Sequence, residues 1–447
     1  MQKGNLKLIA VAAVVVIVVL LASWQLYGDQ SRQVSERFAE GMMEGDYSEC
    51  YDMMSDEAKE IYDTLGGEEA FAAEMSLIVA GLEMQYGPYT GIGESRMLAE
   101  NAPGTAILFQ YSGAMLCTFM DAEGAVTLYC FYSYDLPSDD PVPEGIVEED
   151  VQVGPDGMTP LPGKLSYAEG SDHSSVVVLV AGSGPHGMNC AMGENQIFQQ
   201  IAWGLNEKGV DVLRYDKRTY ADPIASSELG SYLDIGYETV DDAVAAAQLL
   251  DSMGYESIYV VGHSLGAMMA PAIVAQSDGL YDGMVSLAGS PRDLVQVQYD
   301  QNMAVIGAMP DGPEKDAALL LVQGEMAKYN AIGQMSQEDL LGTTIFGISA
   351  YYQKSIMDMD TVGSALALDV PMLFLQGTSD WQVSVENDYS AWLDILSGKE
   401  NVEGELYVGL NHIFAIPGEG QGTTMEYYAP QTVNPSVIDD IATFVLA

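Results

Sequence analysis

The chain has 447 residues, 48% of them hydrophobic, which is enough for a sizeable core and for more than one domain. It carries 65 acidic residues against 16 lysines and arginines, a formal net charge of −49 at pH 7. A field of that sign repels polyanions, so nucleic acid is not expected as a partner. Its cysteines, Cys50, Cys117, Cys130 and Cys190, lack the close Cys or His neighbours of a zinc site. We expect neither a metal ion nor an organic cofactor, and the sequence carries no signal for a particular oligomeric state.

The first 28 residues predict a membrane segment. Lys3 and Lys7 precede residues 8–27, which are 20 residues without a charge. About 20 apolar residues cross a bilayer as a helix, and positive charge before the segment favours export of the residues after it. We therefore expect residues 1–28 to be an uncleaved single-pass anchor in the cell membrane, with the catalytic part extracytoplasmic. The alternative is a cleaved signal peptide and secretion, although no clean A-x-A cleavage site is present after the apolar segment.

Residues 29–137 predict a small α+β domain, because helical segments come first and strand-like runs follow at 106–111, 114–120 and 126–134. A Phe-x-x-Gly-x-x-x-Gly-Asp-Tyr run begins at Phe38, and a Phe-Met-Asp-x-x-Gly hairpin begins at Phe119. These motifs resemble the nuclear-transport-factor-like cone domain, which is often found ahead of bacterial hydrolases. The domain holds no set of catalytic side chains, so we expect it to have a packing or binding role.

Two of the cysteines are predicted to face each other in this domain. If Glu123-Gly124 forms a two-residue hairpin loop, Cys117 lies opposite Cys130 at a non-hydrogen-bonded position, where side chains approach closely. Two buried thiols are the favoured interpretation, and a cross-strand disulfide is the alternative.

Residues 138–150 are polar and proline-rich and are predicted to be a linker. From 151 to 447 strand-like and helix-like segments alternate, which predicts an α/β fold with a mainly parallel sheet and helices on both faces. The helix at 240–253 has Thr239 as its expected N-cap, with Asp242 completing a variant of the capping box. Residues 290–360 interrupt the alternation with helical sequence, where a lid over an active site would lie. The expected strands are 176–181, 210–215, 257–261, 284–288, 370–376 and 405–408, and the other expected helices are 195–207, 385–396 and one from Pro435.

The chain is organised around the sequence Gly-His-Ser-Leu-Gly at 262–266, which lies between a strand-like run and a helix-like run. Strand, G-x-S-x-G and helix in this order form a nucleophile elbow, which exposes the serine hydroxyl on a tight turn. Gly262 and Gly266 flank the turn because a Cβ at either position would collide with the neighbouring strand or helix. Ser264 is the expected nucleophile.

A serine hydroxyl needs a base, and the base needs a carboxylate to orient it. Of the four histidines, His412 alone follows the serine at a distance, whereas the side chain of the adjacent His263 is expected to point away from Ser264. Asp380 follows the preceding strand-like run and is the expected acid. Asp388 and Asp394 fall in the next helix, where we expect them on its solvated face.

The tetrahedral intermediate of acyl transfer needs two N–H donors for its oxyanion. One is the backbone amide of Leu265, which follows the nucleophile. The second is expected from the glycine-rich loop after residues 176–181, with Ser183 as the preferred donor and Gly184 as the fallback.

At this point the chain resembles the exported bacterial α/β-hydrolases, a serine esterase family, over about 290 residues. The resemblance implies ester hydrolysis through an acyl-enzyme on Ser264, Asp380 and His412, with a small-molecule ester as the substrate. Ala181 stands where many of these enzymes have His, so the acyl pocket differs. Lys217 lies in an Asp-Lys-Arg cluster that either steers an anionic substrate or, as we favour, forms a structural ion pair. The segments that carry the resemblance are LVAGSGP at 179–185, AWGL at 202–205, VLRYDKRT at 212–219, VDDA at 240–243, GHSLG at 262–266 and LQG at 375–377.

Two other functions remain open from the sequence. A serine peptidase or amidase would use the same three side chains, although the chain lacks the large propeller domain that usually restricts peptide access. An envelope binding protein with a vestigial hydrolase domain is the third interpretation, which an intact serine, acid and base disfavour.

Overall fold

The computed structural model describes residues 30–447, which form two compact units that divide between Leu136 and Pro137. The predicted anchor at 1–28 lies outside the described residues. Within 30–447, no helix combines the length and the apolar character that a bilayer crossing requires.

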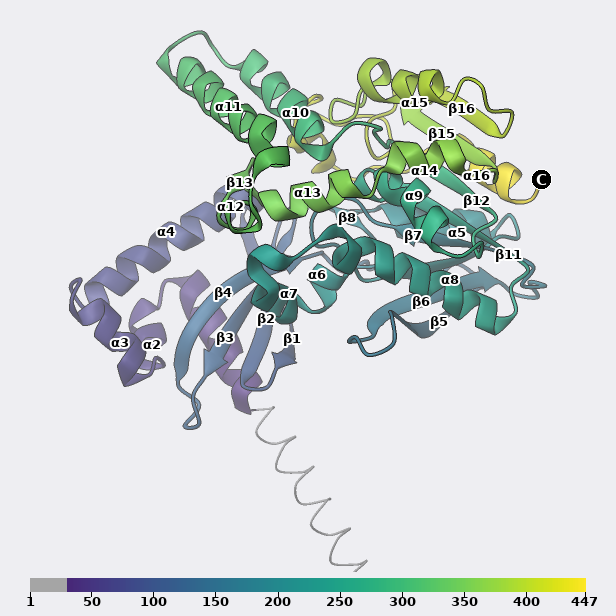
Figure 1. Ribbon diagram of the computed structural model, residues 1–447. Coiled ribbons are helices and arrows are strands. Elements are labelled where there is room, and N and C mark those ends of the chain that lie inside the picture. The colour runs from purple at the N-terminus through teal and green to yellow at the C-terminus, as the bar shows by residue number, and fades with distance from the viewer. Residues whose placement is uncertain (1–29) are drawn as a thin grey trace, which may run out of the picture. The chain divides into compact units, whose positions relative to one another are not determined.

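In the first unit, helices precede a four-stranded antiparallel sheet with the strand order β1-β2-β3-β4 (Figure 1). Aromatic and aliphatic side chains, among them Phe38, Phe71 and Leu116, form the core between the helices and the sheet. Ser55 begins one helix by accepting a hydrogen bond from the Ala58 amide, as an N-cap serine does. Residues 30–44 are helical, followed by α2 (Tyr47–Asp52), α3 (Asp56–Asp63), α4 (Glu68–Tyr86), β1 (Tyr89–Ala99), β2 (Ala102–Phe109), β3 (Gly113–Met120) and β4 (Val126–Tyr134).

The hairpin between β3 and β4 pairs Cys117 with Cys130, and both are free thiols. The predicted two-residue loop is wrong, because Met120 pairs with Val126 and the Asp121 amide donates to the Ala125 carbonyl. A register shift between the Phe119–Leu128 and Met120–Val126 pairs compensates for the longer loop, so Cys117 and Cys130 still lie opposite each other.

The second unit contains an eight-stranded sheet in the order β16-β15-β12-β11-β7-β10-β6-β5. The six strands from β16 to β10 are parallel, whereas β6 and β5 add an antiparallel edge. The edge pair was not predicted, and β5 begins at Ile146, so the last five residues of the expected linker belong to the sheet. Its acidic, half-exposed sequence IVEEDVQV lacks the apolar run that reveals a central strand. The strands are β5 (Ile146–Val153), β6 (Leu161–Ala168), β7 (Ser175–Val180), β10 (Asp211–Tyr215), β11 (Ser257–His263), β12 (Gly283–Leu287), β15 (Met372–Gly377) and β16 (Val402–Tyr407).

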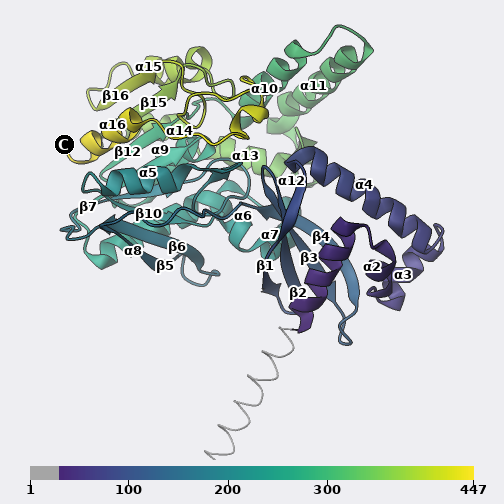
Figure 2. The ribbon, with the colours of Figure 1, turned by 180° about the vertical axis from the view of Figure 1, so that it is seen from behind.

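Helices cover both faces of this sheet, as the run of apolar residues in β7 requires (Figure 2). Val176, Val178 and Val180 face one core and Val177 and Leu179 the other. The first core contains residues of α8 (Asp241–Met253), α9 (Leu265–Gln276) and α15 (Ser390–Ile395), and the second contains residues of α5 (Ile197–Asn206) and α16 (Pro435–Val445).

Two details of these helices differ from the prediction. Thr239 does not cap α8, because the chain is already helical from Gly236 and the Asp234 carboxylate accepts the early amide of Tyr237. Asp242 is buried in an ion pair with Arg218 instead of completing a capping box.

Between β12 and β15 the chain inserts five α-helices, and the first four lie within residues 290–360, where a lid was expected (Figure 1). They have a small core of their own, built around Val295, Ile332 and Ile345. The inserted helices are α10 (Leu294–Ala308), α11 (Pro313–Ala331), α12 (Gln337–Gly342), α13 (Ala350–Asp358) and α14 (Thr361–Ala367), with a short hairpin of β13 (Thr344–Ile345) and β14 (Ile348–Ser349) before α13.

Candidate active site

Ser264 occupies a strained turn between β11 and α9. Its φ of 55° and ψ of −114° are unusual for a residue with a side chain, and its amide donates to the Leu287 carbonyl on the neighbouring strand at 2.9 Å. A Cβ at Gly262 would overlap the carbonyl of Gly266, and a Cβ at Gly266 would overlap the carbonyl of Val180. Both glycines are therefore required, and the turn has the geometry of a nucleophile elbow.

Asp380 and His412 come together from the loops after β15 and β16. The His412 Nδ1 lies 2.7 Å from Asp380 Oδ2, and the imidazole is almost fully buried. The carboxylate is further held by the amides of Gln382 and Val383 at 2.8 and 3.0 Å and by the Gln376 side chain at 2.9 Å. Because the carboxylate accepts at Nδ1, the other ring nitrogen of His412 is left to accept a proton.

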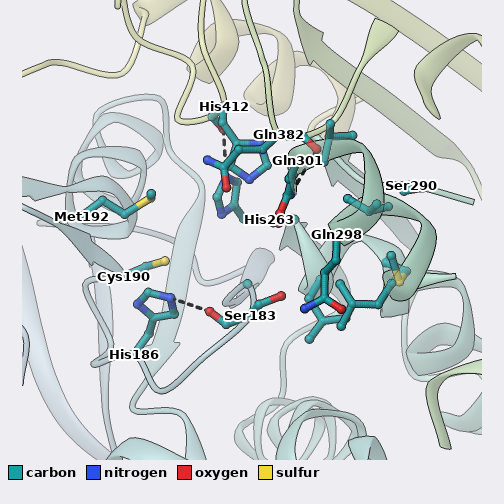
Figure 3. A pocket seen from close by; sticks show the side chains of 17 residues that line it. Ser183, His186, Cys190, Met192, His263, Ser290, Gln298, Gln301, Gln382 and His412 are labelled. Atoms are coloured by element: carbon teal, nitrogen blue, oxygen red, sulfur yellow. Dashed lines mark hydrogen bonds between the residues drawn. The ribbon is translucent and has the colours of Figure 1, made fainter. Parts of the chain in front are cut away.

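Ser264 and His412 line one cavity of about 160 Å³, which we call the catalytic cavity (Figure 3). Within residues 30–447, the structure contains no direct hydrogen bond between the Ser264 hydroxyl and the His412 ring. Such contacts are often long before substrate binds and shorten in the complex. Ser264 and His412 thus reach the same cavity, and Asp380 contacts His412 without lining the cavity itself.

His263 also lines this cavity, which corrects the expectation that its ring points away from Ser264. Its Nε2 donates to the backbone carbonyl of His412 at 3.0 Å. Burial, together with the neighbouring His412, lowers the pKa of His263 to about 3, so the ring is neutral at pH 7. His263 therefore supports the loop that carries His412.

The loop after β7 brings Gly182 against Ser264, since a Cβ on that glycine would lie 3.1 Å from the Ser264 Cβ. Lys217 Nζ donates to the Gly182 carbonyl at 2.7 Å, and His186 Nε2 donates to the Ser183 carbonyl at 3.0 Å. The described peptide bonds are all trans, so each N–H points opposite to the carbonyl of its own peptide. Lys217 therefore fixes the direction of the Ser183 N–H, and His186 fixes that of the Gly184 N–H.

The amide of Leu265, the predicted first oxyanion donor, needs no such support. Leu265 is the first residue of α9, and the amides of a first helical turn have no partner within their own helix. Its N–H is therefore available beside Ser264, at the end of the helix where the dipole favours negative charge.

Both cations of the Asp-Lys-Arg cluster are buried in ion pairs. Lys217 Nζ lies 3.3 Å from Glu238 Oε2, and Arg218 pairs with Asp242 through two hydrogen bonds. Burial raises the pKa of Asp242 to about 6 despite this partner. The favoured structural interpretation is correct for both cations. The hydrogen bond that Lys217 also donates to the loop after β7 was not predicted.

Several cavity residues carried no signal in the sequence. Gln298 and Gln301 lie on α10 of the insertion, and Gln382 follows Asp380 by two residues (Figure 3).

Asp388 was expected on a solvated face but is fully buried, where it accepts hydrogen bonds from Ser290 and Arg292. Asp394 is exposed as expected. Among the described residues, no cluster of three metal-binding side chains occurs.

Comparison with known proteins places these features in context. A family model described as serine aminopeptidase, S33, matches residues 172–415, which include Ser264, Asp380 and His412. The esterase EstD of Thermotoga maritima is 35% identical over 334 residues, which are 73% of this chain and 75% of EstD.

Solved structures are also similar. The esterase Est1E from Butyrivibrio proteoclasticus has 15% identity and a TM-score of 0.41, with coverage of 66% of this chain and 97% of Est1E. A puromycin-hydrolyzing peptidase of Mycobacterium tuberculosis has 15% identity and a TM-score of 0.42, with coverage of 77% of this chain and 46% of the peptidase.

Proposed function

Because the chain belongs to the serine aminopeptidase S33 family and is a serine esterase-type hydrolase, we propose that it cleaves carboxylic esters through an acyl-enzyme on Ser264. The observation that carries the proposal is the buried 2.7 Å contact between His412 and Asp380 beside a serine on a strained elbow. Base, acid and nucleophile are the parts that acyl transfer requires.

In the first half of the reaction, Ser264 Oγ attacks the ester carbonyl while His412 Nε2 accepts the hydroxyl proton. Negative charge develops on the carbonyl oxygen, where the amide of Leu265 and the amide of Ser183 donate to it. His412 then gives the proton to the departing alcohol. Asp380 stays ionised and stabilises the imidazolium that forms in between.

In the second half, water replaces the alcohol. His412 accepts a proton from the water as it attacks the acyl carbonyl, and the same two amides stabilise the second tetrahedral intermediate. Collapse of that intermediate returns the proton to Ser264 and releases the carboxylic acid.

Amide cleavage is the second candidate, because the family description names an aminopeptidase. An aminopeptidase must bind the substrate's terminal ammonium, for which a carboxylate is the usual partner. The described lining of the catalytic cavity contains no Asp or Glu side chain. This neutral lining favours an ester over a peptide with a free N-terminus.

The experiment combines covalent labelling with two substrate types. A fluorophosphonate probe should label the full-length protein, and Ser264→Ala should abolish both the label and hydrolysis of p-nitrophenyl esters. Ser290→Ala is a matched control, because this serine lines the same cavity and should leave the label in place. A label that persists in Ser264→Ala refutes the proposal. Faster cleavage of a peptide p-nitroanilide than of every ester would favour the amidase.

We further propose that residues 1–28 tether the enzyme to a membrane with its catalytic unit outside the cytoplasm. Support comes from the 20 uncharged residues at 8–27 and the two lysines before them. Fractionation of cells that express the full chain should return the enzyme with the membranes, whereas recovery of a shortened protein from the medium would indicate secretion instead.

A further inference from the structure

A second cavity, of about 290 Å³, lies beside the oxyanion loop. It shares Ser183, Leu265 and Leu294 with the catalytic cavity, so the two spaces meet next to the two proposed oxyanion donors. Leu233 and Ile348, the latter from the lid insertion, line this second cavity but not the catalytic cavity. We call this space the acyl chamber.

Apolar groups make up most of the described lining of the acyl chamber. Besides Ser183, the polar side chains that line it are Glu238, Tyr352 and Ser349, and each of these three has a hydrogen-bond partner within the protein. Glu238 is the acidic residue in its described lining, and it receives hydrogen bonds from Tyr352 and Thr219 and an ion pair from Lys217. A polar ligand group would find few partners there. A hydrocarbon chain would instead gain from leaving water.

The mechanism determines which part of an ester each cavity receives. His412 gives its proton to the leaving alcohol, so the alcohol must lie on the side of His412. His412 lines the catalytic cavity and is not part of the acyl chamber. The acyl chain extends away from the base, past Ser183 and Leu265, and this direction leads into the acyl chamber.

The alcohol side has a different chemistry, because three glutamines line it (Figure 3). One end of each side-chain amide is held within the protein. The Gln301 amide donates to the backbone carbonyl of Gln382, the Gln382 amide donates to the Tyr427 hydroxyl, and the Gln298 side-chain oxygen accepts from Gln353. Within the described residues, the side-chain oxygens of Gln301 and Gln382 and the side-chain nitrogen of Gln298 form no hydrogen bond. Neutral donors and acceptors of this kind match the hydroxyl groups of an uncharged polar alcohol.

We propose that the substrate is an ester of a medium-length apolar fatty acid with an uncharged polyhydroxy alcohol. The acyl chain occupies the acyl chamber, and the alcohol is bound by the three glutamines. This inference rests on the proposed function, since the direction of the ester comes from the roles of Ser264 and His412.

The experiment measures two ratios of kcat/KM on the full-length enzyme. The acyl ratio compares p-nitrophenyl octanoate with p-nitrophenyl acetate, and the alcohol ratio compares 1-octanoylglycerol with ethyl octanoate. Each buried methylene contributes up to about fourfold, so the acyl ratio of the wild type should exceed ten. The glycerol ester should be preferred by at least about fivefold, the effect of one net hydrogen bond.

Single substitutions then separate the two sites. Leu233→Trp fills the acyl chamber and should lower the acyl ratio at least tenfold without changing the alcohol ratio. Gln301→Leu should lower the alcohol ratio without changing the acyl ratio. Tyr232→Trp is the matched control, because its side chain is exposed on the same loop and does not line either cavity, so both ratios should stay at the wild-type value.

Fluorophosphonate labelling of every variant separates failure of this inference from failure of the proposed function. Absence of label in the wild type rejects the proposed function itself. Labelled enzyme that prefers acetate, or whose acyl ratio is unchanged by Leu233→Trp, rejects the acyl chamber. A change of the acyl ratio by Gln301→Leu rejects the division between the cavities. Ile348→Trp fills the same chamber from the lid and replaces Leu233→Trp should that variant fail to fold.

Discussion

Replacement of Lys217 by Met tests how the oxyanion loop is held. The substitution keeps the length of the side chain but removes the ammonium that donates to the Gly182 carbonyl at 2.7 Å. Because that carbonyl and the Ser183 N–H belong to one trans peptide, the loss frees the N–H to rotate away from the oxyanion. We expect kcat to fall while KM changes little, because the donor acts on the transition state.

The expected fall in kcat is smaller than that for complete loss of an oxyanion donor, because Lys217→Met leaves the Ser183 N–H in place. Deletion of an oxyanion donor lowers kcat by about 10²- to 10³-fold. In Lys217→Met the Ser183 N–H is still present but is no longer held, so we expect a fall of about ten- to a hundredfold. This corresponds to about 1.4–2.7 kcal/mol of transition-state stabilisation.

The stability of Lys217→Met must be measured beside its kcat, because the substitution leaves Glu238 buried without its cation and destabilises the fold. A broken buried ion pair costs about 3–5 kcal/mol. The double variant Lys217→Met/Glu238→Gln removes the charge as well and should fold with a higher Tm than the single variant, at the same reduced kcat. Steady-state hydrolysis of p-nitrophenyl acetate and a thermal melt on the same sample supply both numbers.

The adjacent Arg218–Asp242 pair provides the matched control, because its hydrogen bonds go to Asp242 and to the Thr159 carbonyl and none goes to the oxyanion loop. Arg218→Met/Asp242→Asn should lower the Tm and keep kcat within twofold of the wild type. Equal losses of kcat in the two double variants would refute the positioning role of Lys217. If Lys217→Met is harmless and His186→Phe lowers kcat instead, the second donor is the Gly184 amide.

Two further outcomes are expected at the site. Asp380→Asn should lower kcat about 10⁴-fold with little change in KM, since an amide at that position favours the wrong tautomer of His412; a loss under tenfold in steady-state kinetics would contradict the triad. Burial lowers the pKa of His263 to about 3, so below about pH 6.5 the unfolded chain binds a proton that the native chain does not, and the free energy of unfolding falls as the pH drops toward 3. In urea unfolding, the loss of stability between pH 7 and pH 5 should be smaller by about 2 kcal/mol in His263→Asn than in the wild type, and equal losses would contradict the neutral buried ring.

The parts of the site that sequence could predict are those with local signals. Ser264 lies in a tight turn that requires two glycines in fixed positions, and this requirement is visible within five residues. Asp380 and His412 each follow a strand of the parallel sheet, and such strands end at one edge, so their order along the chain was enough to bring them together.

The parts that could not be predicted depend on contacts between distant segments. Asp388 has the sequence context of an exposed helical residue, and it is buried only because Ser290 and Arg292 at the start of the lid insertion donate to it. Likewise, Lys217 follows β10, and its bond to the Gly182 carbonyl reaches the loop after β7, 35 residues earlier in the chain. Edge strand β5 was not predicted because it pairs on one side only and exposes Glu149 and Asp150 to solvent.

The net charge of this enzyme does not reveal where its few basic side chains lie. Three of the 16 basic side chains, Arg214, Lys217 and Arg218, are buried within five residues at the end of β10, and each is paired with an acid. The described lining of the catalytic cavity contains no Asp, Glu, Lys or Arg side chain despite a formal net charge of −49. For the uncharged ester proposed above, selection comes from the glutamine amides and the apolar walls, because such a substrate offers no charge for the long-range field to attract. In the proposed reaction, hydrolysis of the acyl-enzyme releases a carboxylate, and the strongly negative net charge of the protein repels this product.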